Sequence, residues 1–153
     1  MEAMKIMLVD DEERFLSTTQ KLLIKKGIDV VSATSGAEAL EMLRQMHIHV
    51  VILDVKMPGM DGNETLMKIK RQFPLVEVIM LTGHATVESA IDGLKSGATD
   101  YLIKPTEVDD LIAKAREAFQ KRQLVEEKIR MAQSRNYMKS PREIIKGVEK
   151  HAL

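Results

Sequence analysis

Acidic residues stand at two points of the sequence where a short apolar run ends. Asp10 and Asp11 follow the run Lys5–Val9, and Asp54 follows the run His49–Leu53. Both runs are nearly continuous and rich in β-branched residues, which is typical of strands buried on both faces of a parallel sheet. Ligands of open α/β sheets bind beyond the carboxyl ends of the strands. If these two strands are neighbours, we expect the three carboxylates to share one pocket.

A pocket of this kind needs a cation, because carboxylates a few ångströms apart repel one another strongly. All-oxygen ligands without His or Cys indicate a hard ion, and few carboxylates with open water positions favour Mg²⁺ over Ca²⁺. Thr82 and Lys104 end the fourth and fifth apolar runs, so a hydroxyl and an ammonium group would face the acids. This combination suits a phosphoryl group, with a carboxylate as the nucleophile.

Each of these residues also has an ordinary explanation when taken alone. An Asp after a strand is most often the cap of the next helix, a Thr there caps in the same way, and a Lys at a strand end is usually solvated. The coincidence of all of them at the ligand-binding edge favours the functional interpretation.

The elements that must position these side chains follow a strict alternation. Segments with helical periodicity separate five apolar runs, which predicts an α/β fold with a doubly wound, five-stranded parallel sheet and the flavodoxin-like strand order 2-1-3-4-5. The predicted strands are Lys5–Val9, Ile28–Ala33, His49–Leu53, Val76–Leu81 and Tyr101–Ile103.

Local signals mark several helices. Ser35 has capping-box spacing with the acid three residues later, and Gly27 and Gly97 are placed to end the first and fourth helices. Ala90, Ile91 and Leu94 fall at helical spacing and mark the fourth helix.

The fifth helix is expected to be unusually long. Good helix formers continue from about Glu107 through Ala132, with apolar residues at a heptad-like spacing that Arg122 interrupts. A short terminal helix is predicted over Pro141–His151, with Ser140 as its N-cap. We therefore expect a domain over residues 1–122 and a helical C-terminal extension over residues 123–153, which is too short for an independently folded output domain.

Composition limits the class of protein. The 153 residues include no Cys, which excludes disulfides and thiolate metal sites, and no apolar run approaches the roughly 20 residues that span a bilayer. The N-terminus is wrong for a signal peptide, so a cytoplasmic protein without membrane contact is expected.

Residues 1–113 carry 12 basic against 18 acidic residues, and residues 114–153 carry 11 against 5. A solvated helix face explains the basic end better than a nucleic-acid site does.

Four motifs in order resemble the receiver domain of two-component response regulators, over about residues 4–122. They are IMLVDDE at 6–12, ILDVKMPGMDG at 52–62, MLTGHAT at 80–86 and SGATDYLIKP at 96–105. The resemblance implies that Asp54 is the phosphoacceptor and that Asp10, Asp11, Asp54 and the backbone carbonyl of Lys56 arrange Mg²⁺. It implies that Thr82 and Lys104 contact the phosphoryl oxygens.

The resemblance also suggests roles around the site. Tyr101 matches the family's switch aromatic, which turns inward when the Thr moves toward the phosphate; a ring that merely packs is the alternative. Lys56 and His84 occupy positions similar to those that tune dephosphorylation in the family. The Lys104–Pro105 bond is expected to be cis.

The function implied is a phosphoacceptor switch that is charged by a histidine kinase or phosphotransfer protein and catalyses only its own phosphorylation and dephosphorylation. Its downstream target would be an unknown protein, and a homodimer could form through the face of the fourth and fifth helices or through the extended fifth helix. The alternative is the receiver part of a longer transcriptional regulator. A phosphohydrolase is disfavoured because Lys56 stands where a second acid is needed, and a flavin site because acids follow the first strand.

Overall fold

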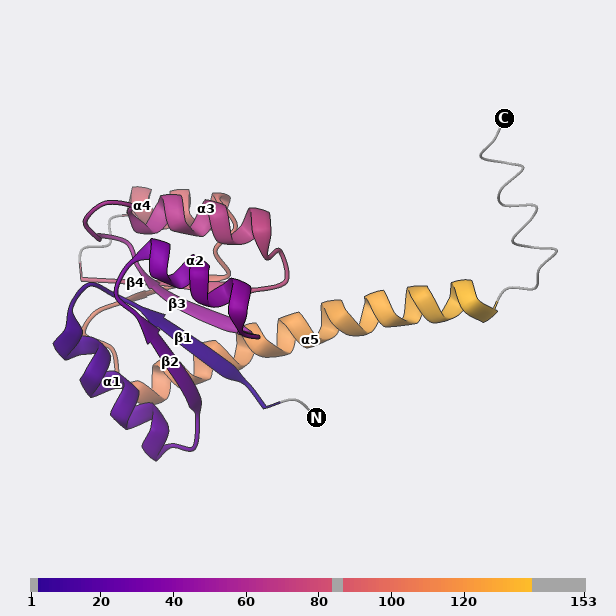
Figure 1. The fold of residues 1–153 in the computed structure, drawn as a ribbon, viewed down its shortest axis with the longest axis horizontal. Helices are drawn as coiled ribbons and strands as arrows, with labels where there is room; N and C mark the ends of the chain where they lie inside the picture. Colours follow the sequence, from indigo (N-terminus) through magenta and orange to yellow (C-terminus); the bar gives the residue numbers. More distant parts are fainter. Residues whose placement is uncertain (1–2, 84–86, 139–153) are drawn as a thin grey trace. The chain divides into compact units, whose positions relative to one another are not determined.

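The computed structural model describes residues 3–83 and 87–138. The chain divides into two compact units, Met1–Arg122 and Gln123–Leu153. The predicted helix at Pro141–His151 lies outside the described residues. The elements, labelled in Figure 1, are β1 (Lys5–Val9), α1 (Glu13–Lys25), β2 (Asp29–Ala33), α2 (Gly36–Gln45), β3 (Val50–Asp54), α3 (Gly62–Gln72), β4 (Glu77–Thr82), α4 (Val87–Lys95), β5 (Asp100–Ile103) and α5 (Val108–Met138).

The first unit is built on one parallel sheet with the order β2-β1-β3-β4-β5, which confirms the predicted topology. Val9 of β1 pairs with Leu53 of β3. The residues that follow, Asp10 and Asp54, therefore emerge side by side at the carboxyl edge of the sheet. Thr82 pairs with Ile103 at the same edge, so Lys104 follows directly beside Thr82.

Two apolar layers enclose the sheet, because side chains alternate between its faces along each strand. Met7, Val51 and Met80 belong to a core cluster that includes side chains of α2 and α3. Ile6 and Ile52 belong to a second cluster, which includes side chains of α1 and of the first turns of α5. The central strands β3 and β4 are buried throughout, which explains why their sequences read as continuous apolar runs.

The predicted helix boundaries are confirmed where local chemistry sets them. The Ser35 hydroxyl accepts a hydrogen bond from the backbone N–H of Glu38 at 3.1 Å and caps α2. Gly27 and Gly97 have φ of +78° and +107° at the ends of α1 and α4. Only glycine adopts such angles at low cost, so both helices end where their glycines stand.

Helix α4 forms where the sequence predicts it, but Ile91 and Leu94 do not form its buried face. Ile91 and Leu94 are 45 % and 48 % exposed, whereas Gly93 is buried. A Cβ at Gly93 would lie 3.5 Å from the ring of Tyr101 and 3.6 Å from Met80. The helix therefore approaches the sheet with its glycine, and a side-chain pattern gives no signal for a contact that depends on a missing side chain.

Polar side chains anchor the middle of α5 at the amino-terminal edge of the sheet. Arg122, which interrupts the heptad-like pattern, is buried and donates to the backbone carbonyl of Ile48 at 2.8 Å. His49 is also buried; its Nδ1 accepts from the Lys5 backbone N–H at 3.0 Å, and its ring meets Phe119 edge-on. These contacts join α5 to β1 and β3 on the side of the sheet away from the aspartates.

Beyond Arg122, the described side chains of α5 are no longer buried. Residues 123–135 of α5 contain no buried side chain, and Leu124, Ile129 and Met131 are 64 %, 43 % and 51 % exposed. Within the described part of the chain, no helix is long and apolar enough to cross a membrane.

Candidate functional site

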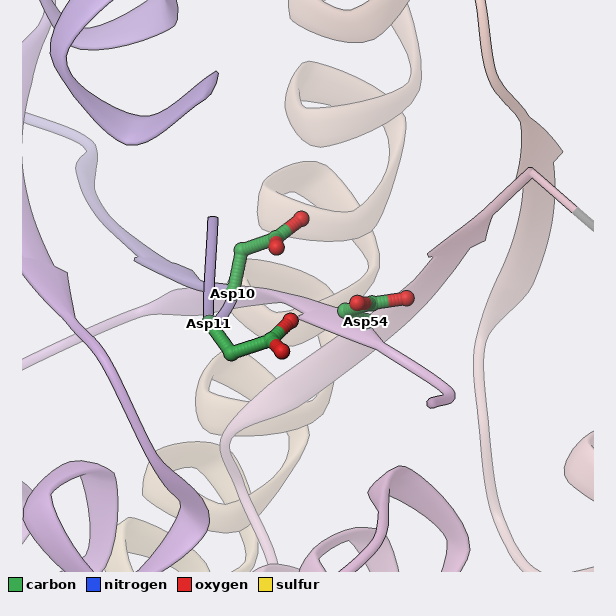
Figure 2. A group of neighbouring side chains, drawn as sticks. All are labelled: Asp10, Asp11 and Asp54. Carbon is green, nitrogen blue, oxygen red and sulfur yellow. The ribbon is translucent and has the colours of Figure 1, made fainter. Parts of the chain in front are cut away.

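The carboxyl edge of the sheet gathers the three predicted aspartates. Carboxylate oxygens of Asp10, Asp11 and Asp54 all lie within 4.8 Å of one another. Figure 2 shows the three side chains extending into the same space from the ends of β1 and β3. The structure therefore brings together the residues that the sequence placed at one pocket.

Asp10 is almost completely buried and its two oxygens have different partners. Oδ1 accepts from the backbone N–H of Glu12 at 2.9 Å, which orients the carboxylate at the start of α1. Oδ2 accepts from the Lys104 Nζ at 2.5 Å, in an ion pair that is itself largely shielded from solvent. A charge-assisted hydrogen bond to a buried carboxylate is a strong contact, and it fixes the ammonium beside the acids.

Burial raises the pKa of Asp54 to about 6, and the negative charges of Asp10 and Asp11 act in the same direction. The positive charge of Lys104 and the backbone N–H of Lys56 lower this pKa, but not enough to cancel the effect. The Lys56 N–H lies 3.4 Å from Oδ1 of Asp54. The ionised form of Asp54 is therefore less favourable here than it would be in water.

This donor set fits a divalent cation with hard-oxygen preference. All three side chains offer carboxylate oxygens, two of them from buried residues, and the burial and mutual repulsion that raise the Asp54 pKa would be relieved by a positive ion. Asp11 is exposed, which leaves one side of the group open to water. Mg²⁺ commonly keeps several waters when it binds to a few carboxylates.

Thr82 and Lys104 reach the same edge from β4 and β5. The backbone N–H of Lys104 donates to the carbonyl of Thr82 at 2.8 Å, and the Thr82 side chain is buried. The Lys104–Pro105 peptide bond is cis, as predicted. A hydroxyl and an ammonium group therefore lie at the ends of the two strands that continue the sheet beyond Asp54.

The loop after β3 is closed by a contact that only glycine permits. The Gly62 backbone N–H donates to the carbonyl of Val55 at 2.8 Å, and a Cβ at Gly62 would lie 2.3 Å from the backbone oxygen of Asp54. Asp61 caps α3 by accepting from the Glu64 N–H at 2.8 Å. The start of α3 is thereby packed directly on the backbone that carries Asp54.

The remaining predicted residues are placed less completely. Lys56 is exposed, with its N–H toward Asp54; the role of its carbonyl as a metal ligand stays a prediction. Tyr101 is half-buried against the core cluster and lies near Gly93 of α4. His84 lies outside the described residues.

A family model for the response regulator receiver domain matches residues 6–116. The chain belongs to this family. Receiver domains of response regulators are phosphorylated by histidine kinases and generally bind Mg²⁺ at an acidic pocket.

Relatives and solved structures agree with this assignment. The transcriptional regulatory protein ZraR of Escherichia coli (strain K12) is 43 % identical over 108 residues, which are 71 % of this chain and 24 % of ZraR. The DNA-binding transcriptional regulator NtrC of the same strain is 34 % identical over 108 residues, 71 % of this chain and 23 % of NtrC. The chain thus spans about a quarter of the length of these regulators.

Among solved structures, a response regulator receiver domain protein from Clostridium thermocellum has a TM-score of 0.75 at 37 % identity, covering 80 % of this chain and 98 % of its own. The receiver domain of NtrX from Brucella abortus has a TM-score of 0.71 at 32 % identity, covering 75 % and 98 %. The doubly wound fold of this receiver domain is therefore shared with experimentally determined structures.

One contact in this receiver domain was not foreseen from the sequence. The Nζ of Lys104 lies 4.1 Å from the ring centroid of Phe15, within cation–π range. From the sequence, Phe15 is only one apolar residue of the first helix. Its position in the first turn after the acids is the one signal that could have placed it near the site.

We expect Gly62→Ala to displace Asp54. The added methyl group would meet the backbone of Asp54 and of Val55, at 2.3 and 2.6 Å, and a backbone cannot move aside as a flexible side chain does. The variant should lose several kcal/mol of unfolding free energy, on the scale of overpacked sites, and should bind Mg²⁺ more weakly. Urea denaturation and Mg²⁺ titration measure the two effects.

Gly83→Ala is the matched control, because a Cβ there meets nothing within 4 Å. It should stay within about 1 kcal/mol of the wild type, as changes without a clash or special backbone usually do. Equal losses in the two variants would contradict the packing explanation.

The raised pKa of Asp54 predicts that its contribution to the unfolding free energy of the metal-free protein decreases as the pH rises through the acidic range. Asp54 ionises near its ordinary value of 3.8 in the unfolded chain and at about 6 in the folded one. The folded state therefore binds the proton more tightly, so the contribution of Asp54 to stability falls between about pH 4 and pH 6 and stays low above that. The rise in pKa corresponds to at most roughly 3 kcal/mol.

Asp54→Asn removes this titration and serves as the comparison. The unfolding free energy of the variant, minus that of the wild type, should increase from about pH 4 to pH 6 in EDTA and shrink when Mg²⁺ is added. Chemical denaturation at several pH values measures the difference. A difference that does not change with pH would show that Asp54 is not perturbed in the folded state.

Proposed function

We propose that Asp54 is the phosphoacceptor of this receiver domain and that Asp10, Asp11, Asp54 and the backbone carbonyl of Lys56 hold Mg²⁺ beside it. The observation that carries the proposal is the convergence of the three carboxylates within 4.8 Å, with the Lys104 ammonium paired to one of them. The phosphoryl donor would be a histidine kinase or a phosphotransfer protein.

The chemistry follows from charge. In the transfer, an oxygen of the Asp54 carboxylate forms a bond to phosphorus while the P–N bond to the donor histidine breaks, and the electron pair of that bond stays on the imidazole. Asp10, Asp11 and Asp54 would hold Mg²⁺, which when bound would supply positive charge beside the Asp54 carboxylate and the phosphoryl oxygens. Lys104 adds an ammonium charge to those oxygens, and Thr82 donates its hydroxyl to them.

The same residues provide the switch. Lys104 is engaged with Asp10 in the present structure, so a phosphoryl group on Asp54 would be a further partner for its ammonium and would change the balance of this contact. We infer that movement of Thr82 toward the phosphoryl group is coupled to Tyr101, which lies against α4 through Gly93. The exposed Ile91 and Leu94 of α4 lie on the surface that would then change for a partner.

The lifetime of the phosphoryl group is proposed to depend on Lys56 and His84. Lys56 is exposed next to Asp54, where its length and charge would screen an attacking water molecule. The protein would then catalyse only its own phosphorylation and dephosphorylation, as a switch and not as an enzyme with a separate substrate. A cytoplasmic location stays a prediction.

For the output, the first candidate is phosphorylation-dependent contact with another protein, because the described residues beyond the receiver domain form a single exposed helix. The second candidate is the receiver part of a longer transcriptional regulator. It is favoured by the relatives, which are transcriptional regulators about four times as long as the matched region. The length of the reading frame in its genome decides between the two. Nucleic-acid binding is not proposed for the described residues alone.

The central test is phosphorylation by a small donor. Incubation with acetyl phosphate and Mg²⁺ should add one phosphoryl group to the wild type, measured by intact-mass spectrometry, because the acceptor carboxylate is ionised once the metal is bound. Asp54→Ala should gain none, and neither should the wild type in EDTA.

Persistence of the added mass in Asp54→Ala would show that another residue is the acceptor. If neither protein gains mass, a histidine kinase replaces acetyl phosphate as the donor, and failure there as well would reject the proposed function.

The exposed part of α5 suggests a homodimer. Leu124, Val125, Ile129 and Met131 present apolar surface along a helix whose residues 123–135 are, apart from these four and Ala132, polar. Val125 and Ile129 are four residues apart and fall on one face of the helix, at the spacing of a coiled-coil seam. We propose that two copies of the chain pair through this face.

Ile129→Asp should shift the protein toward monomer, because a carboxylate in an apolar seam loses its hydration without gaining a partner. Sedimentation velocity of the wild type and the variant measures the change. Lys128→Asp, one residue away and exposed, is the matched control and should leave the oligomeric state unchanged. A wild type that is monomeric at all concentrations would reject the homodimer.

A further inference from the structure

The ammonium group of Lys104 has two partners in the pocket. One is Oδ2 of Asp10 at 2.5 Å, and the other is the ring of Phe15, whose centroid lies 4.1 Å from Nζ. Both lie within the range in which a cation is attracted, the first by full charge and the second by the negative face of the aromatic ring. Lys104 is therefore held at a defined place, although its side chain is long and flexible.

The ring of Phe15 is held more rigidly than the side chain of Lys104. Phe15 is the third residue of α1, and its half-buried side chain packs against the core cluster that includes Leu8, Ile52 and Leu81. Lys104 itself follows β5 in a loop segment, where its backbone N–H donates to the carbonyl of Thr82. The core thus fixes the ring, and the ring restricts where the ammonium lies.

The position of the ammonium matters for metal binding. Oδ1 of Asp10 accepts from the Glu12 N–H, and Oδ2 accepts from the Lys104 ammonium. An ammonium at 2.5 Å from Oδ2 repels a divalent cation that approaches the same carboxylate, so the two positive charges compete for it. Whatever stabilises the ammonium there lowers the apparent affinity for the metal.

We propose that Phe15 is a positioning residue that holds Lys104 on Asp10 in the metal-free state and thereby sets the Mg²⁺ affinity of the site. This inference rests on the proposed function, since it assumes that Asp10, Asp11 and Asp54 bind the metal. The ring acts through Lys104 and contacts neither the metal nor the phosphoryl group. Its removal releases the ammonium and makes Asp10 more available.

The test is a double-mutant cycle on Mg²⁺ affinity in the intact chain, followed by NMR amide shifts. Phe15→Leu removes the aromatic face and should bind Mg²⁺ roughly two- to fivefold more tightly, the factor expected for a partly exposed cation–π contact. Phe15→Tyr keeps the aromatic face and should match the wild type. Far-ultraviolet circular dichroism and thermal unfolding in EDTA establish that each variant is folded.

The double-mutant cycle distinguishes an effect of Phe15 on the position of Lys104 from an effect of Phe15 on the packing of the site. In a Lys104→Met background there is no ammonium to hold, so Phe15→Leu should then leave the Mg²⁺ affinity unchanged. An equal effect of Phe15→Leu in both backgrounds would overturn the proposal, because it would show that the ring acts on the site through packing. No effect of Phe15→Leu on affinity in the wild-type background would overturn it as well.

Failure of the underlying function looks different. If the wild type shows no Mg²⁺ response, or one that Asp54→Asn leaves intact, then the metal site itself is wrong and this inference falls with it. If the wild type binds Mg²⁺ through Asp54 and only the Phe15 variants fail to respond, the site stands and the role of Phe15 is rejected.

Discussion

The repulsion among three carboxylates is the interaction on which this protein depends. Carboxylate oxygens of Asp10, Asp11 and Asp54 lie within 4.8 Å of one another, and burial, reinforced by the negative charges of Asp10 and Asp11, raises the pKa of Asp54. A cation that binds among these carboxylates stabilises the folded protein, because it offsets their mutual repulsion. The rest of the domain supplies the rigid frame that keeps the three groups together despite their mutual repulsion.

That frame is the parallel sheet with its two apolar layers. The register of β1 against β3 places Asp10 beside Asp54, and the close approach of Gly62 packs α3 on the backbone of Asp54. At the opposite edge, Arg122 and His49 join α5 to the central strands. The carboxylates therefore cannot move apart without disturbing strands that are buried on both faces.

In the proposed switch, Lys104 would connect the charge balance of the site to phosphorylation, because one ammonium group has to serve more than one partner. In the present structure it is paired with Asp10 and lies over the ring of Phe15. A metal ion and a phosphoryl group would each change the balance of charge that holds it there. The present structure is thus stabilised by a contact whose balance the proposed active state would change, as is expected of a two-state switch.

The sequence by itself determined the strands, their order and the residues that end them. Strand identity follows from apolar runs, and the position of Asp10, Asp54, Thr82 and Lys104 follows from where those runs stop, since parallel strands align their carboxyl ends. Capping and glycine signals placed the ends of α1, α2 and α4 for the same reason, because each is a local interaction.

Only the tertiary structure decided which groups touch. The pairing of Lys104 with Asp10, the ring of Phe15 above it and the pKa of Asp54 depend on distances between segments as much as 94 residues apart, which no local pattern encodes. The face of α4 that packs on the sheet was not evident from apolar spacing because its contact is made by Gly93, and Arg122 interrupts an apolar pattern because its partner, the carbonyl of Ile48, comes from a distant loop.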